Sequence, residues 1–172
     1  MQPTPVSVYL TLLTSMFMHG GLAHLFGNML YLWIFGDNIE DDMGHARYAV
    51  FYLLCGLLAS LAHVLTNTDS FIPSLGASGA ISGVLGGYLL LHPRRRVHAI
   101  VLRFVTEVPG WVAVGLWFVL QLINGLGMLG SCSQAGGVAY AAHIGGFLAG
   151  VALVKLFVIG RPRRPAPAFR GY

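Results

Sequence analysis

Long stretches without a single charged side chain constrain this sequence more than any other feature. No Asp, Glu, Lys or Arg occurs in residues 1–36, 48–68, 70–93 or 108–154. A helix that spans a membrane needs about 20 mostly apolar residues, so the last of these stretches is long enough for two. Only 9% of the residues are charged, against about 25% in soluble domains, which is too few to cover a soluble globule. The chain is therefore predicted to be an integral membrane protein.

The same stretches indicate helices rather than strands. Lipid offers the backbone no hydrogen-bond partners, and the sequence lacks the alternation that a membrane barrel requires. The predicted fold class is an all-α membrane protein, a polytopic bundle of about five transmembrane helices. The predicted spans are Leu22–Phe35, Arg47–Leu65, Ala77–Leu91, Trp111–Leu129 and Val138–Ile159. We expect a single domain over 1–172, with an outer loop or interfacial segment (1–21), the bundle (22–160) and a basic cytoplasmic tail (161–172).

The basic residues set the orientation of the predicted spans. With the C-terminus in the cytoplasm, all ten Lys and Arg residues fall on or near the cytoplasmic side, as the positive-inside bias requires. The basic tail could also be a nucleic-acid patch, but it is short and directly follows a span, so no nucleic-acid partner is expected. We expect a multi-pass membrane protein, located in the cell membrane if the source is bacterial.

Four polar side chains from three of the predicted spans share one depth. His24 and Asn28 lie in the first turns of the first span, Ser78 begins the third, and His143 lies in the second turn of the fifth. All three spans enter the membrane from the outer side in this topology. Polar side chains inside a membrane are costly and are candidates for function. We therefore expect these four side chains to meet in the outer third of the membrane.

Two faces of small residues would let the spans that carry Ser78 and His143 pack closely. Their residues recur at a spacing of four and are Gly79, Gly83 and Gly87 in the third span, and Ala142, Gly146 and Gly150 in the fifth. Such faces let helix backbones touch in lipid. Packing them together would bring Ser78 within reach of His143.

The residue types at this depth fit nucleophilic catalysis. A serine hydroxyl needs a neighbouring base, and His143 has the right type and depth to activate Ser78. His24 and Asn28 are four residues apart, so they share a helix face and could donate hydrogen bonds to an oxyanion. A helix N-terminus near Ser78 would also suit an oxyanion. The carboxylate on the outer side is Asp69, in a loop, so we expect a Ser-His dyad without a third, carboxylate member.

Each of these features also has a structural interpretation. The segment Gly76–Ala80 alone is more typical of a helix-packing face. His143 could be a hydrogen-bond partner between helices, and His24 and Asn28 could hold a loop. The convergence of these positions on one depth favours the catalytic interpretation. His19 and His24 are five residues apart and no carboxylate or thiolate cluster completes a ligand set, so no metal site is expected.

Four blocks of the sequence, in order and over most of the chain, resemble motifs of the rhomboid family of intramembrane serine proteases. Each block is a weak signal alone, and together they are highly specific. They are His19–Asn28, which resembles the family's His-x4-His-x3-Asn segment, Gly36-x3-Glu40-x3-Gly44, which resembles its Gly-x3-Glu-x3-Gly loop, Gly76–Gly79, which resembles its nucleophile motif, and Ala142–Phe147, which resembles its base-bearing helix.

The resemblance implies a rhomboid-like bundle with named roles for the polar residues. Ser78 is the nucleophile and His143 the general base. His24, Asn28 and the backbone of Ser78 line the oxyanion hole, and Gly76 shapes the turn before the nucleophile. The resemblance further implies cleavage of transmembrane protein substrates near their outer ends, within the lipid bilayer, with no cofactor and no metal.

Three further expectations come from the same resemblance. The family core has six spans and this chain starts just before the second, so we expect a chain that lacks the first helix. The aromatic residue that often follows the nucleophile by four and stacks on the base is Ser82 here, so we expect His143 to pack against Phe147 or Tyr140. Glu40 anchors a cytoplasmic loop by resemblance, although a solvated acid is an equally good interpretation.

The predicted function is therefore an intramembrane serine endopeptidase with a Ser-His dyad. The alternative is a catalytically silent rhomboid-like protein that binds or escorts membrane clients, and the presence of both Ser78 and His143 disfavours it. A third interpretation, a transporter, needs a polar pathway through the bilayer. The inner halves of the spans offer only Gln121 and Asn124 for such a pathway.

Overall fold

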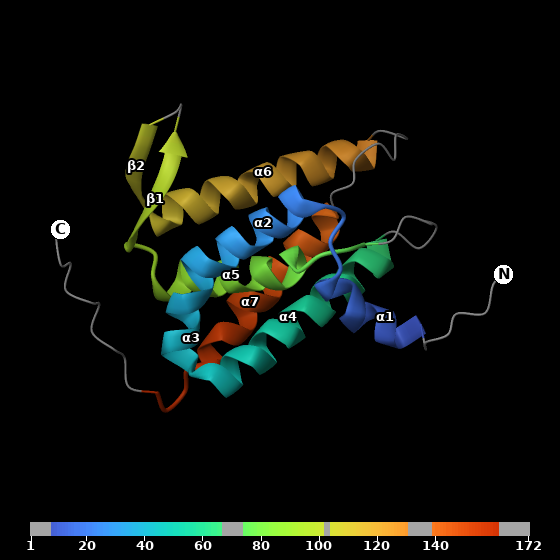
Figure 1. Ribbon diagram of the computed structural model, residues 1–172, viewed down its shortest axis with the longest axis horizontal. Coiled ribbons are helices and arrows are strands. Elements are labelled where there is room, and N and C mark those ends of the chain that lie inside the picture. Colours follow the sequence, from blue (N-terminus) through green and yellow to red (C-terminus); the bar gives the residue numbers. More distant parts are fainter. Residues whose placement is uncertain (1–7, 67–73, 102–103, 131–138, 162–172) are drawn as a thin grey trace.

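The computed structural model describes residues 8–66, 74–101, 104–130 and 139–161. Over these ranges the chain is a bundle of helices with one two-stranded hairpin beside it (Figure 1). In chain order the helices and strands are α1 (Val8–Thr14), η1 (Ser15–Phe17), α2 (Leu22–Tyr31), η2 (Leu32–Gly36), α3 (Asp37–Met43), α4 (His45–Thr66), α5 (Ser78–Leu91), β1 (Arg96–Val101), β2 (Phe104–Pro109), α6 (Gly110–Gly130) and α7 (Tyr140–Phe157).

Helix α5 is the centre of the bundle and packs against both α4 and α7 (Figure 1). Ten consecutive residues of α5, Gly79–Tyr88, are buried. A Cβ atom at Gly146 of α7 would overlap the carbonyl oxygen of Gly79. In the same way, a Cβ atom at Gly150 would overlap the carbonyl oxygen of Gly83. The predicted packing of the two small-residue faces is therefore confirmed, and it brings the backbones of α5 and α7 into direct contact.

Apolar side chains also cover much of the outside of the bundle. Helices α4 and α7 are long and apolar enough to cross a membrane, whereas α5 and the part of α6 up to Leu126 are shorter apolar helices. A large exposed apolar surface is unusual for a soluble monomer and is normal where lipid covers the protein. The exposed apolar side chains of α4 are Val50, Leu54, Leu57, Leu58, Leu61, Val64 and Leu65.

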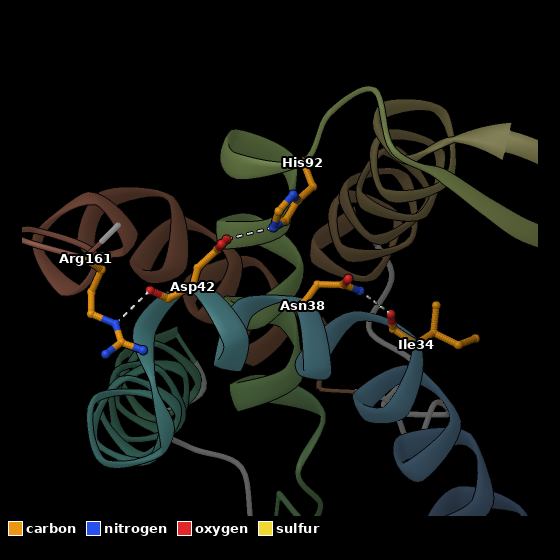
Figure 2. A network of polar contacts seen from close by, with 5 residues as sticks. All are labelled: Ile34, Asn38, Asp42, His92 and Arg161. Atoms are coloured by element: carbon orange, nitrogen blue, oxygen red, sulfur yellow. Dashed lines mark hydrogen bonds and ion pairs between the residues drawn. The ribbon is translucent and has the colours of Figure 1, made fainter. Parts of the chain in front are cut away.

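The first predicted span continues beyond its expected end as one helical run. Helix α2 passes into η2, a π-helical turn, and then into α3, and Asn38 Nδ2 donates to the carbonyl oxygen of Ile34 at 3.0 Å across this junction (Figure 2). The run ends at Gly44, whose φ of 81° suits a residue without a Cβ. Glu40 thus lies on α3 rather than in a loop. Its Oε1 is 2.6 Å from Nδ1 of His45, at the start of α4, so Glu40 links the two helices.

Strands β1 and β2 form an antiparallel hairpin that was not predicted from the sequence. Arg96 pairs with Pro109 at one end and Val101 with Phe104 at the other. Both strands are rich in β-branched residues, which favour extended backbone. The predicted spans leave residues 92–110 as a connection, and the basic run at its start gives this connection the composition of a polar loop. The hairpin joins the end of α5 to the start of α6.

Polar contacts join several helices at the end of the bundle where α5 and α7 finish (Figure 2). His92, just after α5, places Nε2 2.7 Å from Oδ2 of Asp42 on α3. Arg161, beyond α7, donates from Nε to the carbonyl oxygen of Asp42 at 3.4 Å. Arg47 of α4 donates to two carbonyl oxygens at the end of α7, at 3.2 and 2.7 Å. We call Asp42, Arg47, His92 and Arg161 the basal network.

Candidate active site

Ser78 is the first residue of α5 and follows a turn at Gly76. Gly76 has a φ of 113°, which residues with a Cβ rarely adopt. Its N–H donates to the carbonyl oxygen of Ser15 at 2.9 Å, so the N-terminal segment holds the turn in place. A Cβ atom at Gly76 would also lie only 2.8 Å from ring atoms of His24. Both constraints require glycine at position 76. The turn then places Ser78 at the N-terminal end of α5.

Ser78 and His143 are hydrogen bonded across the contact between α5 and α7. Ser78 Oγ lies 2.8 Å from His143 Nε2, a distance that permits proton transfer. Both side chains are half-buried. The contact depends on the backbone packing of Gly146 against Gly79, because these glycines lie within one turn of His143 and Ser78 respectively. With the ring hydrogen on Nδ1, the hydroxyl donates and Nε2 accepts, which is the arrangement of a nucleophile and its base.

The other ring nitrogen of His143 has a partner that was not predicted. His143 Nδ1 lies 2.8 Å from Oε1 of Gln121 on α6. The ring of Trp117, one turn earlier on α6, lies 6.0 Å from the imidazole ring between centroids, tilted by 39°. A signal was present in the sequence, since a glutamine inside a span is costly and residues four apart share a helix face. Gln121 was considered only for a transport pathway, because the sequence does not tell which way α6 faces.

The expected aromatic neighbours of His143 are corrected by this geometry. Phe147 stacks on Phe118, with ring centroids 4.0 Å apart, and the ring beside His143 is that of Trp117. Tyr140 packs its Cβ toward Gly125 of α6. Ser82, which occupies the family's aromatic position, is fully buried and donates from Oγ to the carbonyl oxygen of Ser78 at 2.6 Å. The short side chain at position 82 is thus bonded to the backbone of α5 and supplies no ring to stack on His143.

His24 and Asn28 of α2 lie beside the turn that precedes Ser78. A Cβ atom at Gly76 would be 2.8 Å from His24 Nε2 and 3.5 Å from Asn28 Nδ2. Within the described residues Asn28 is buried, with 6% of its surface exposed, and its Nδ2 has no hydrogen-bond partner. His24 Nδ1 accepts the N–H of Gly20 at 3.4 Å, so in the neutral ring Nε2 carries the hydrogen. Two N–H groups thus remain available beside Ser78.

The start of α5 adds backbone donors to this side of the site. The first N–H groups of a helix have no partner within the helix, and no side chain caps α5 at Ala77. The positive end of the helix dipole favours negative charge at the same place. Among the described residues no group of three metal-ligating side chains lies together. The chemistry available at this site is therefore that of a serine, a histidine base and several N–H donors.

A family model described as "Rhomboid domain" matches residues 7–160 of the chain. Among curated relatives, "Rhomboid protein 1, mitochondrial" of Saccharomyces cerevisiae is 34% identical over 155 residues, which cover 88% of this chain and 42% of that protein. The "Rhomboid protease GluP" of Bacillus subtilis is 34% identical over 143 residues, 83% of this chain and 25% of that protein. The bovine "Presenilin-associated rhomboid-like protein, mitochondrial" is 31% identical over 142 residues, 81% of this chain and 36% of that protein. The chain thus spans less than half the length of these relatives.

Proposed function

The chain belongs to the rhomboid family, and from this premise we propose that it is an intramembrane serine endopeptidase that cleaves transmembrane segments of other membrane proteins. The observation that carries the proposal is the 2.8 Å contact between Ser78 Oγ and His143 Nε2. A serine hydroxyl bonded to a histidine base is the arrangement that acyl transfer requires. The Bacillus subtilis relative, whose name includes the word protease, supports the same reaction class.

In the acylation step Ser78 Oγ attacks the carbonyl carbon of the substrate peptide bond while His143 Nε2 takes the hydroxyl proton. The carbonyl oxygen becomes negative and receives hydrogen bonds from Asn28 Nδ2, His24 Nε2 and the first N–H groups of α5. The carbon–nitrogen bond then breaks and His143 gives its proton to the leaving amine. The product is an ester between the substrate's acyl group and Ser78.

In the deacylation step a water molecule attacks the ester carbonyl and His143 takes the water proton. The bond to Ser78 Oγ breaks, the carboxyl product leaves and the proton returns to Ser78. A cavity of about 10 Å3 adjoins Ser78 and has room for about one water. Ser15, Ser60 and Ser74 are among the residues that line this cavity, together with apolar residues such as Met16 and Ala59. No cofactor, metal ion or nucleic acid takes part in the proposed reaction.

The proposed enzyme is a single multi-pass membrane domain whose C-terminus lies in the cytoplasm. The described helix ends around Ser78 carry no Lys or Arg, whereas the opposite end carries Arg47, the run Arg94–Arg96 and Arg161. The positive-inside bias then directs the basal network to the cytoplasm and Ser78 toward the outer face. Substrate segments would be cut near their outer ends. In a bacterial source this membrane would be the cell membrane.

The alternative, a catalytically silent protein that binds or escorts membrane clients, makes a different prediction for the same residues. Such a protein has no use for a hydrogen bond between a serine and a histidine, and Ser78 and His143 could then be replaced without loss of function. No observation in the described part of the chain favours this alternative over the enzyme.

The test is cleavage of a reporter transmembrane segment by the purified protein in liposomes. Ser78→Ala and His143→Ala should each abolish cleavage, and the double variant should be no worse, because nucleophile and base act as one unit. Matched controls are Thr14→Val, which removes an exposed hydroxyl on α1, and His98→Ala, which removes an exposed imidazole from the hairpin. Both controls should cleave at the wild-type rate. Substantial cleavage by Ser78→Ala would refute the proposal, and binding without cleavage by the wild type would support the silent alternative.

A further inference from the structure

The imidazole of His143 is held by α6 on the side that faces away from the nucleophile. Gln121 Oε1 lies 2.8 Å from Nδ1, and Ser78 Oγ lies 2.8 Å from Nε2, so the ring is bonded at both nitrogens. An amide oxygen only accepts hydrogen bonds, so the hydrogen of the neutral ring must sit on Nδ1. That tautomer leaves the lone pair of Nε2 free for the proton of Ser78.

We propose that Gln121 is the positioning residue of the base and does for His143, without charge, what a buried carboxylate does in a Ser-His-Asp triad. This inference rests on the proposed function. In a triad the third residue holds the imidazole in the correct tautomer and orientation. Gln121 supplies the acceptor that both tasks need.

The described acidic residues do not compete for this role. Asp37, Glu40, Asp41 and Asp42 lie on α3, toward the far end of the bundle, and Glu107 lies on β2. Charge at the base is therefore set by few groups. Helix α6 carries no titratable side chain and α5 carries none at this end, whereas α7 itself carries Tyr140 and the last turns of α4 carry His63. On α2, His24 lies beside the Gly76 turn that precedes Ser78.

A neutral acceptor suits a base within the membrane domain. A carboxylate that is buried loses its hydration, which is unfavourable unless hydrogen bonds and opposite charges in the protein offset the desolvation free energy. An amide orients the same hydrogen without that cost. Trp117 precedes Gln121 by four residues, so one face of α6 presents both the hydrogen-bond acceptor and the aromatic ring to His143. The rotation of α6 about its axis thus determines how the base is held.

The competing view is that Gln121 only ties α6 to α7. Hydrogen bonds between membrane helices make a modest contribution to stability. A tie of this kind would change the melting temperature and leave the pH dependence and the tautomer of His143 unchanged. The two views therefore differ in measurements that do not depend on stability.

The test compares Gln121→Leu, which removes the acceptor at similar volume, with Gln121→Glu, which keeps an acceptor and adds a charge. Asn124→Leu is the matched control, because Asn124 is an exposed amide on the same helix. We expect Gln121→Leu to lower kcat by roughly tenfold to a hundredfold with KM unchanged, which is part of the roughly 10²–10⁴-fold that a positioned base contributes. Gln121→Glu should keep activity, with the acid limb of its pH profile moved to higher pH, because a carboxylate stabilises the imidazolium. Asn124→Leu should match the wild type in kcat, in KM and in the pH at which the acid limb of its profile lies.

A second readout does not require proteolysis. Nitrogen NMR of histidine-labelled protein, with the His143 signals identified by their loss in His143→Ala, reports which ring nitrogen carries the hydrogen. The wild type should show hydrogen on Nδ1, and Gln121→Leu should lose that preference. An unchanged tautomer in Gln121→Leu, or wild-type kcat with an unmoved acid limb in Gln121→Glu, overturns the proposal. If the wild type fails to cleave, the proposed function is wrong and the NMR result alone decides whether Gln121 positions His143.

Discussion

The charged side chains at one end of the bundle and the Asn28 amide at the other are used in opposite ways. In the basal network the charged groups are bonded to one another or to backbone: Asp42 to His92, and Arg47 to the end of α7. At the end that carries Ser78, Asn28 keeps an N–H without a partner in the described part of the chain. Hydrogen-bonded polar groups stabilise a fold, whereas a buried donor without a partner lowers the free energy of unfolding. Such a donor is therefore a candidate for a functional role. The buried hydroxyls of Tyr48 and Tyr88, near the basal network, also lack a partner among the described residues, so it is the position of Asn28 beside the Gly76 turn that assigns its donor to the substrate. We infer that the basal network stabilises the bundle and that the Asn28 donor is reserved for substrate.

The glycines of α5 and α7 join the two ends. Their backbone contact fixes the distance between Ser78 and His143 at one end and aligns the helix ends that carry His92 and Arg161 at the other. Changes at this contact should therefore affect both ends, and changes within either end should affect only that end. The following predictions test this division, from the largest effect to the smallest.

Gly150→Ala should disrupt both ends at once. Its Cβ would overlap the carbonyl oxygen of Gly83, so α5 and α7 would have to separate. Overpacking typically costs about 1–3 kcal/mol, and overlap with backbone should reach or exceed that range, with most of the cleavage activity lost. Thermal unfolding in detergent and the cleavage assay measure the two effects.

Gly115→Ala is the matched control on α6, since a Cβ there meets nothing within 4 Å. It should unfold at the wild-type temperature or slightly above, because alanine is favoured over glycine in a helix by about 1 kcal/mol. Equal stability of the two variants would contradict the role of the α5–α7 contact.

Asn28→Ala should lower turnover by roughly 10²–10³-fold while the melting temperature stays the same, because loss of one oxyanion donor typically has that cost. Asn38→Ala is the control at the other end of the same helical run. It removes a hydrogen bond to Ile34 and should lower stability by about 1 kcal/mol without changing turnover. A loss of stability in Asn28→Ala that matches its loss of activity would make Asn28 a structural residue.

Asp42→Ala should lower the stability of the fold and leave turnover unchanged. It removes the carboxylate that His92 contacts at 2.7 Å, in a pair of which about a fifth of each side chain is exposed. Hydrogen bonds to charged groups contribute about 1.5–3 kcal/mol to stability, so the melting temperature should fall. At temperatures where the variant is still folded, its turnover should equal that of the wild type. Reduced turnover in fully folded Asp42→Ala would show that the two ends are coupled.

Arg47→Gln should have the smallest effect. Its guanidinium bonds carbonyl oxygens at the end of α7 from an exposed position, where a cation contributes about 0.3–1 kcal/mol and salt screens it. A small decrease in melting temperature that disappears at high salt is the expected result. A large decrease that persists in salt would assign Arg47 a greater share of the basal network's stability.

Much of the bundle could be predicted because charge and residue size act locally. Stretches without charge predict membrane helices, and glycines at a spacing of four predict close packing. Ser78 and His143 could be paired from their shared depth and the small-residue faces beside them, since each lies near the start of its helix. These inferences use only the sequence of each helix. They do not require knowing which face of the helix is turned toward its neighbours.

The contacts of α6 with His143 depend on the rotation of that helix about its axis. The hairpin depends on whether a short segment forms strands or a loop. Gln121 and Trp117 contact His143 only because α6 turns one particular face toward α7, and hydrophobicity all round the helix hides that face. Ser82 points inward for the same reason. The hairpin was missed because short strands beside a basic run resemble a polar loop. The catalytic roles of Ser78, His143, His24, Asn28 and Gly76 stay predictions until turnover is measured.

The most direct test of the central claim is to map the residue that a fluorophosphonate probe modifies in the folded protein. A serine activated by a neighbouring base reacts with such a probe, and an ordinary serine does not. We predict a single adduct on Ser78 in the wild type, retained in Asp42→Ala and lost in His143→Ala. An adduct on another residue, or labelling that persists in Ser78→Ala, would contradict the assignment of Ser78 and His143 as nucleophile and base.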